Sequence, residues 1–301
     1  MAYEQTAATP PTAGSSILLP VATLIGAMAS LSIGASFAKG LISVIGAQGA
    51  VTFRVVIAAL ILLALWRPWR LRLSWRSAGT IILYGVSLGT LNLLFYMSIR
   101  SIPIGVAVAV QFLGPLTVAI ATSRRAADLV WVVFAVEGLL MLLPLAHSGS
   151  GLDPTGIAYA LGAGVCWALY IVFGQMTAGV HPGQATALGM TIASMVVLPF
   201  GVAHAGAMLL DPSLLLAGAA VAILSSAVPH SLQMVALRQL PKRTYSIMLS
   251  LEPAMSALAA AVVLNERLTE VQLLAIGCII IASIGSTANA RIPAKPPGSI
   301  D

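Results

Sequence analysis

Ten long apolar segments follow one another along the chain, and none shows the alternation of apolar and polar residues that predicts a half-buried strand. Five are expected at Ile17–Ala38, Ala47–Trp66, Thr80–Ile99, Pro103–Thr122 and Leu129–His147. Five more are expected at Gly156–Gln175, Thr186–Val202, Leu214–Leu237, Tyr245–Leu264 and Val271–Ala288. A helix of about 20 apolar residues crosses a bilayer, whereas the strands of a membrane barrel alternate. The pattern therefore predicts an all-α integral membrane protein with ten transmembrane helices.

Composition supports this prediction and excludes soluble enzymes and nucleic-acid binders. Of the 301 residues, 59% are apolar and only 8% are charged, while soluble domains are about 25% charged. Most of the basic residues behind the net charge of +6 lie in short connections, so we expect a lipid bilayer and no nucleic acid as partner. The two cysteines, Cys166 and Cys278, form no metal-binding pattern, and we expect neither a metal nor a cofactor.

The Lys and Arg residues are distributed unevenly between the two sides of the predicted membrane protein. With the N-terminus inside, eleven lie on the cytoplasmic side, three lie on the outer side, and Arg54 lies within a span. The eleven are Arg67, Arg70, Arg72, Arg76, Arg124, Arg125, Arg238, Lys242, Arg243, Arg291 and Lys295. The three are Lys39, Arg100 and Arg267. Because cytoplasmic loops are rich in Lys and Arg, we expect both termini in the cytoplasm, with residues 1–16 and 289–301 as disordered tails.

A weak internal repeat relates the two halves of the chain. Arg100-Ser101-Ile102-Pro103 matches Arg238-Gln239-Leu240-Pro241 at an offset of 138 residues, which also maps Pro115 onto Pro253. Because five spans is an odd number, the second half must be inverted relative to the first. Proline inside a helix removes a hydrogen bond, so we expect kinks at Pro115, Pro229 and Pro253. Inverted repeats with kinked helices are typical of transporters with a site near the membrane midplane.

Several short stretches resemble one family in their order and spacing. They are Tyr84-Gly85-Val86-Ser87-Leu88-Gly89, Phe112-Leu113-Gly114-Pro115-Leu116, Arg124-Arg125, Leu161-Gly162-Ala163-Gly164 with Cys166-Trp167-Ala168, and Leu249-Ser250-Leu251-Glu252-Pro253. Together they resemble the threonine/homoserine exporter group of the drug/metabolite transporter superfamily. The resemblance implies tandem five-helix EamA repeats at residues 17–147 and 156–288, joined by a periplasmic linker at 148–155. It also implies export of small amino acids across a bacterial inner membrane.

The chain departs from the pattern of this group at positions expected in the central cavity. Gln111 and Gln233 stand where the group usually has Glu, and His230 stands where it usually has Tyr. Glu137 is an additional carboxyl group in the fifth span. These differences concern the substrate and the ion coupling more than the fold.

Glu252 and Arg54 are the first charged candidates for a site within the membrane. A charge at mid-bilayer costs about 2.5–3.5 kcal/mol or more, so Glu252 should face protein or water. It could couple protons or bind a substrate ammonium, or it could be a structural carboxyl bonded to backbone groups freed by Pro253. Arg54 could bind a substrate carboxylate or pair with Glu137 or Glu252, although its depth favours an anchor that reaches the outer interface. Glu137 could also be a second proton site.

Four polar residues are expected to line the cavity: Asn92, Gln111, His230 and Gln233. Asn92 and His230 occupy equivalent positions in the repeat, and His230 and Gln233 share one helix face. Such groups could bond the ammonium and carboxylate of an amino acid, and an imidazole can carry a proton. Alternatively, each could only join helices by hydrogen bonds. Trp167 and Tyr170, in the middle of a span, could form a cavity wall or gate or could simply pack.

Three other functions fit the sequence less well. Gly85-Val86-Ser87-Leu88-Gly89 matches a nucleophile pattern, but it lies in an apolar span without the strand and turn that this pattern needs, which favours a packing face. No lysine stands in a G-K-[ST] nucleotide-binding loop. A selective channel would show rings of charge or a carbonyl filter. We therefore predict that the chain is not an enzyme.

The combined prediction is a secondary active transporter that exports small amino acids such as threonine and homoserine. Alternating access with proton antiport is the predicted mechanism, in which protonation of Glu252, relayed by His230, couples inward proton movement to outward substrate movement. Another amine or metabolite as the substrate, or passive facilitation, are the alternatives. The sequence leaves the oligomeric state open.

Overall fold

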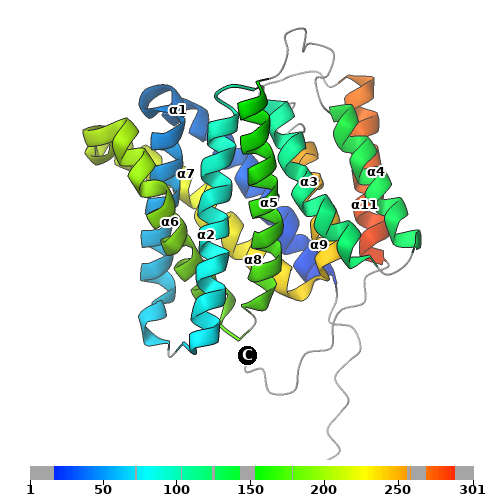
Figure 1. The fold of residues 1–301 in the computed structure, drawn as a ribbon, viewed down its shortest axis with the longest axis horizontal. Helices are drawn as coiled ribbons and strands as arrows, with labels where there is room; N and C mark the ends of the chain where they lie inside the picture. Colours follow the sequence, from blue (N-terminus) through cyan, green and yellow to red (C-terminus); the bar gives the residue numbers. More distant parts are fainter. Residues whose placement is uncertain are drawn as a thin grey trace, which may run out of the picture.

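The computed structural model describes residues 17–71, 73–102, 104–123, 126–142, 153–177, 179–255, 258 and 269–288. These residues form a bundle of helices joined by short connections, and no strand occurs among them (Figure 1). The main helices are α1 (Leu18–Trp66), α2 (Trp75–Ser98), α3 (Ile104–Thr122), α4 (Ala126–Leu142), α5 (Pro154–Met176), α6 (Pro182–Ala205), α7 (Pro212–Ala222), α8 (Val228–Gln239), α9 (Lys242–Met248) and α11 (Glu270–Ala288). The shorter turns are η1 (Pro68–Arg70), η3 (Gly206–Leu210) and η4 (Ile223–Ala227). The expected all-helical architecture is confirmed.

Most of the predicted spans correspond to helices in the structure. Within the described ranges, five helices are long and apolar enough to cross a membrane, at Leu41–Trp66, Trp75–Ser98, Pro154–Met176, Pro182–Leu210 and Pro212–Gln239. Shorter apolar helices lie at Leu18–Gly34, Val106–Thr122, Leu129–Met141 and Leu273–Ala288. Most of the second half of the predicted span Tyr245–Leu264 lies outside the described residues, as do the predicted tails and most of the linker at 148–155.

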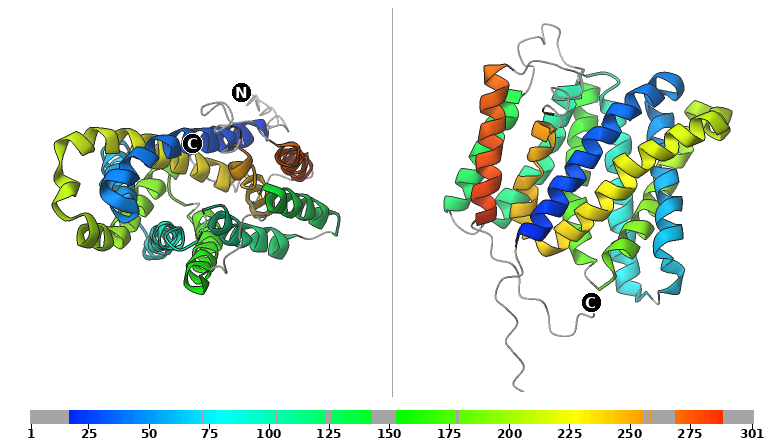
Figure 2. Two further views of the ribbon diagram at one scale, coloured as in Figure 1. Left: turned by 90° about the horizontal axis from the view of Figure 1, so that it is seen from above. Right: turned by 180° about the vertical axis from the view of Figure 1, so that it is seen from behind.

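The first two predicted spans are joined more tightly than the sequence suggests. α1 includes both of them and turns back at Gly46, whose φ of 72° and ψ of 171° are not helical. A positive φ of this kind is accessible to glycine without steric cost. One glycine therefore replaces the loop expected between Ala38 and Ala47, and the two halves of α1 run in opposite directions (Figure 2).

The three prolines expected to kink helices have three different local effects. α3 continues through Pro115 from Ile104 to Thr122. Before Pro229 the chain forms the π-helical turn η4, which accommodates a residue that cannot donate a backbone hydrogen bond. Before Pro253, α9 ends at Met248, and the Glu252 N–H donates to the Leu249 carbonyl at 2.9 Å before helical geometry resumes. Pro253 has no N–H to donate to the Leu249 carbonyl, and the Glu252 N–H satisfies that carbonyl instead, in a tighter turn.

Helices that are equivalent in the repeat pack against each other in pairs. The second half of α1 packs on α6, where Thr52 Oγ1 donates to the Val197 carbonyl at 3.3 Å. α4 packs on α11, and α3 packs on α9. Adding 138 to the residue numbers of one helix in each pair gives roughly those of the other. Pairs of this kind are what an approximate two-fold axis between the two halves of the chain would produce. Figure 2 shows the first half of α1 running beside α7 and α8, while its counterpart α5 packs on α2.

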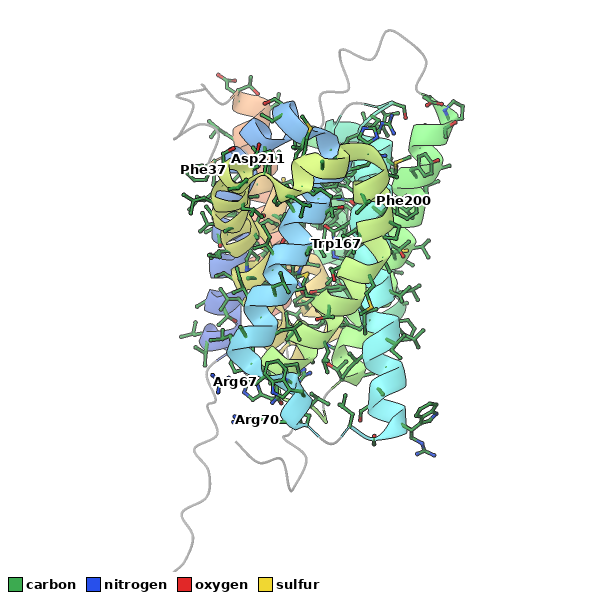
Figure 3. The ribbon with its side chains drawn as sticks, turned by 90° about the vertical axis from the view of Figure 1, so that its left-hand side faces the viewer. Phe37, Arg67, Arg70, Trp167, Phe200 and Asp211 are labelled. Atoms are coloured by element: carbon green, nitrogen blue, oxygen red, sulfur yellow. The ribbon has the colours of Figure 1, made fainter. Side chains whose placement is uncertain are left out.

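The two ends of the bundle differ in charge. Figure 3 places Arg67 and Arg70 at one end, here called the basic end, and Asp211 at the opposite end. The described part of the chain enters α1 and leaves α11 at the basic end (Figures 1 and 2). Asp211 caps α7, where hydrogen bonds from the Ser213 hydroxyl and backbone N–H lower the pKa of the carboxyl group. Asp153 caps α5, and the backbone N–H of Thr155 lowers the pKa of its carboxyl group in the same way.

Glycine allows two pairs of helices to approach backbone to backbone. A Cβ on Gly114 of α3 would lie 1.9 Å from the Gly164 carbonyl oxygen of α5. In α2, a Cβ on Gly85 would lie 2.7 Å from the Gly189 carbonyl oxygen, and one on Gly89 would lie 2.9 Å from that of Ala193. The interpretation of Gly85 and Gly89 as a packing face is therefore confirmed.

Replacing Gly114 with Ala is expected to lower the free energy of unfolding by about 1–3 kcal/mol, because the added methyl group forces α3 away from α5. Gly277→Ala in α11 is the matched control, since a Cβ there meets no atom within 4 Å. Thermal unfolding of both variants in the same detergent measures the difference. Equal midpoints for the two variants would contradict the close crossing.

Candidate functional site

Arg54 lies inside the bundle and is held by α2. Its Nη2 donates a hydrogen bond to Asn92 Oδ1, and its guanidinium lies over the Tyr96 ring at 5.9 Å from the ring centroid. Asn92 is itself fixed, because its Nδ2 donates to the Leu88 carbonyl at 2.8 Å. The favoured interpretation of Arg54 as an anchor at the outer interface is therefore wrong. The position of Arg54 along its predicted span could not identify Asn92 and Tyr96 as its partners.

Aromatic side chains of α5 form the next part of the site. Trp167 meets Phe112 of α3 edge to face, with ring centroids 5.4 Å apart, and Figure 3 shows it between the two ends of the bundle. Tyr170 lies one helical turn further along and donates from its hydroxyl to Gln233 Oε1 at 3.4 Å. Its ring centroid is 6.4 Å from that of His230. α5 thus connects the aromatic residues of α3 with the polar residues of α8.

Glu252 adjoins these groups from the segment that follows α9. It is half-buried in the short helical stretch at residues 251–255, after the turn that ends α9. The charge of Arg54 acts on both Glu252 and His230, and Glu252 acts on Tyr170. We refer to six residues together as the central polar cluster: Arg54, Asn92, Tyr170, His230, Gln233 and Glu252. The structure thus brings together residues that lie up to 198 positions apart in the sequence.

Several polar atoms of this region have no hydrogen-bond partner within the described part of the chain. They are Arg54 Nε, Gln111 Oε1 and His230 Nδ1, and all three are buried. A buried polar atom without a partner costs about 1–3 kcal/mol. A small molecule with its own donors and acceptors could remove that cost. Gln111 lies where α3 crosses α5, since a Cβ on Gly164 would be 2.7 Å from the Gln111 carbonyl oxygen.

Glu137 does not join this site. Its side chain is exposed on α4, which packs on α11. Arg54 instead contacts Asn92 and Tyr96, so the suggested pairing of Arg54 with Glu137 is wrong. The position of Glu137 along its predicted span placed it in the membrane, but that position could not show which face of α4 carries it.

Neither hydrolytic nor metal chemistry is supported by the described residues. Ser87 Oγ donates to the Leu83 carbonyl at 2.7 Å, four residues earlier in the same helix. This bond ties the hydroxyl to its own helix, as in an ordinary buried serine. No group of three or more His, Cys, Asp or Glu residues that could hold a metal ion occurs within the described ranges.

Two groups of residues near the site were missed by the sequence analysis. Tyr84 and Tyr245 are fully buried beside Tyr170, although they lie in spans assigned only by hydropathy. Arg238 was assigned to a loop as an orientation signal, yet its Nη2 donates to Thr177 Oγ1 at 2.6 Å. The match between Arg100 and Arg238 in the repeat was the available signal that Arg238 has a structural role.

The helical bundle, its apolar surface and its polar interior define a multi-pass membrane protein of the transporter class. A solved crystal structure that is 20% identical shares the fold with a TM-score of 0.71, covering 92% of this chain and 98% of its own. The model of the EamA-like transporter family matches residues 154–288. The chain belongs to this family.

Relatives of known name agree with this assignment along nearly the whole chain. The threonine/homoserine exporter RhtA of Escherichia coli K12 is 48% identical over 279 residues, covering 93% of this chain and 95% of the relative. The threonine/homoserine exporter RhtA of Salmonella typhimurium SL1344 is 46% identical over 275 residues, covering 91% and 93%. These relatives are transporters. The expected similarity to the threonine/homoserine exporter group is confirmed.

Proposed function

We propose that the chain exports threonine and homoserine across a bacterial inner membrane. Relatives that are 46–48% identical over more than 90% of the chain carry the name of threonine/homoserine exporters. The observation that carries the proposal is the presence of Arg54 and Glu252 in one polar cluster inside the bundle. A cation and a carboxylate held in one interior suit a zwitterionic amino acid.

In this proposal each charged group of the substrate has a partner of opposite charge. The planar guanidinium of Arg54 binds the α-carboxylate, for which its fork of N–H donors is well matched. Glu252 binds the α-ammonium, and the unpartnered His230 Nδ1 and Gln111 Oε1 are available for further hydrogen bonds. Trp167 and Tyr170 form the wall against which the aliphatic part of the substrate packs. The substrate thus exchanges its hydration shell for fixed polar groups of the protein in the membrane interior.

Threonine and homoserine release from proteoliposomes tests the proposal. Vesicles containing the purified chain, loaded with either labelled amino acid, should release it faster than vesicles without protein. Release no faster than from protein-free vesicles, by a preparation that is folded by thermal unfolding, would contradict the proposed substrates.

The transport mechanism proposed here is alternating access between two inverted repeats, with both termini in the cytoplasm. In this mechanism, polar bonds between α5 and α8 hold the basic end closed. Gln175 Nε2 donates to the carbonyls of Leu237 and Leu240 at 2.8 and 2.9 Å. Arg238 adds bonds to the Val180 carbonyl and the Thr177 hydroxyl. We call these contacts the basic-end latch.

The repeat-equivalent arginine, Arg100, differs from Arg238 in its surroundings. It is exposed at the end of α2, and among the described residues it donates a single long contact of 4.0 Å, to Met97 Sδ. A closed latch at one end and its unlatched counterpart at the other is the asymmetry expected of one state in an alternating cycle. Substrate entry from the basic end would require the latch to open.

Covalent closure of the basic-end latch is expected to stop transport. Gln175→Cys with Leu240→Cys, in a background in which Cys166 and Cys278 are replaced by Ala, allows bridging by a short bis-maleimide while Arg238 stays in place. The bridged protein should release threonine no faster than protein-free vesicles, because α5 and α8 cannot separate. The two single-cysteine variants, treated identically, are the controls. Undiminished release by fully bridged protein would contradict the latch.

A further inference from the structure

Three buried tyrosines from three different helices meet beside Glu252. Tyr84 of α2 and Tyr245 of α9 are 0% exposed, and Tyr170 of α5 is 2% exposed. The ring centroids of Tyr84 and Tyr170 are 5.1 Å apart. Tyr245 lies near Tyr170, and both lie within the electrostatic range of the Glu252 carboxyl group. We call Tyr84, Tyr170 and Tyr245 the tyrosine cluster.

The hydroxyl groups of this cluster are incompletely bonded. The Tyr170 hydroxyl donates to Gln233 Oε1. The hydroxyls of Tyr84 and Tyr245 lie near that of Tyr170, but neither forms a hydrogen bond of good geometry with any residue that the structure describes. Leaving a buried hydroxyl unbonded costs about 1–3 kcal/mol. Phenylalanine would fill the same space without that cost, so packing alone does not account for tyrosine at both positions.

The surroundings of Tyr84 are shaped to hold its ring firmly. A Cβ on Gly189 of α6 would lie 2.1 Å from Tyr84 Cε1, and one on Gly174 of α5 would lie 3.5 Å from Cδ2. Gly189 thus leaves room for this ring against α6, while α5 at Gly174 lies in ordinary contact with it. A ring fixed in this manner presents its hydroxyl in one direction, which suits recognition of a specific group.

We propose that the tyrosine cluster binds the side-chain hydroxyl of the transported amino acid and so selects hydroxy amino acids. This inference rests on the proposed function. A substrate ammonium at Glu252 leaves the side chain of the same small molecule beside Tyr245 and Tyr170. There a substrate hydroxyl can accept from one tyrosine and donate to another, which removes the cost of the unbonded hydroxyls. A site built to bond a hydroxyl group rejects an analogue that lacks it, because its own polar groups then stay unpaired.

Competition between threonine and valine isolates this interaction. Valine has a methyl group in place of the threonine hydroxyl, and the rest of the two molecules is the same. Proteoliposomes loaded with both labelled amino acids report the ratio of their release rates. Wild-type protein should release threonine at least about a hundredfold faster than valine, because a hydroxyl site discriminates far more strongly than an apolar pocket.

Tyr84→Phe and Tyr245→Phe are each expected to lower the threonine-to-valine ratio about tenfold, mainly by slowing threonine release. Tyr159→Phe is the matched control, since Tyr159 lies in α5 outside the cluster and should leave the ratio unchanged. Retained valine release shows that each variant is folded.

The outcomes separate the inference from the function on which it rests. Threonine release by wild type with an unchanged ratio in both variants would overturn the hydroxyl site and leave the exporter proposal standing. Equal loss of both amino acids in the variants would also overturn it, since that is the effect of a structural role. Absence of threonine release by wild type would instead contradict the proposed function.

Discussion

The Glu252→Gln variant is expected to lose the acceleration of threonine release by a pH gradient while still exchanging threonine for threonine across the vesicle membrane. Glutamine has nearly the same shape and can still hydrogen-bond an ammonium group, but it cannot bind and release a proton. In the central polar cluster, Glu252 is the one carboxyl group, and Arg54 is the charge that acts on it. The measurement compares release with and without an imposed gradient, and exchange without one.

Glu270→Gln provides the control for this prediction. Glu270 is exposed in the first turn of α11, away from the central polar cluster, so its replacement should leave gradient-driven release intact. If Glu252→Gln retained the full acceleration by the gradient, Glu252 would not be the coupling acid. Loss of both exchange and gradient-driven release would assign Glu252 to substrate binding alone.

The Arg54→Gln variant is expected to raise the threonine concentration needed for half-maximal release by about thirtyfold or more. Loss of one partner from a buried pair of opposite charges costs about 2–5 kcal/mol, and each 1.4 kcal/mol is a factor of ten in affinity. Glutamine keeps a hydrogen-bond donor for Asn92 and thereby limits damage to the contact between α1 and α2. Release rates over a range of internal threonine concentrations measure the change.

Arg100→Gln removes an arginine from the exposed end of α2 and serves as the matched control. It should leave the concentration dependence of release unchanged. The same concentration dependence in Arg54→Gln and wild type would show that Arg54 holds α2 in place and does not bind the substrate carboxylate.

Most of the helices could be predicted from sequence because hydropathy depends on composition over some 20 residues and not on tertiary contacts. Their ends were less predictable. A break was expected between Ala38 and Ala47, but hydropathy could not show that Gly46 alone makes the turn there. Pro229 and Pro253 were expected to kink helices, but the π-helical turn before one and the helix break before the other depend on local bonding that a residue type does not determine.

The membership of the central polar cluster was more predictable than its geometry. Deep polar residues are costly in lipid, so Asn92, His230, Gln233 and Glu252 could be chosen from their depth alone. For the other two candidates, the helix face that carries the side chain decides whether it belongs to the cluster. Arg54 faces inward and Glu137 faces outward, although both lie within apolar segments. The apolar all-round character of each span leaves no polar face from which these directions could have been read.

The central claim is that the central polar cluster binds an amino acid. Titration of threonine into the purified protein tests this claim most directly. Wild-type protein should show saturable binding of threonine, Arg54→Gln should show affinity reduced about thirtyfold or more, and Arg100→Gln should bind as wild type does. Absence of binding by folded wild-type protein, or equal affinity in wild type and Arg54→Gln, would contradict the claim.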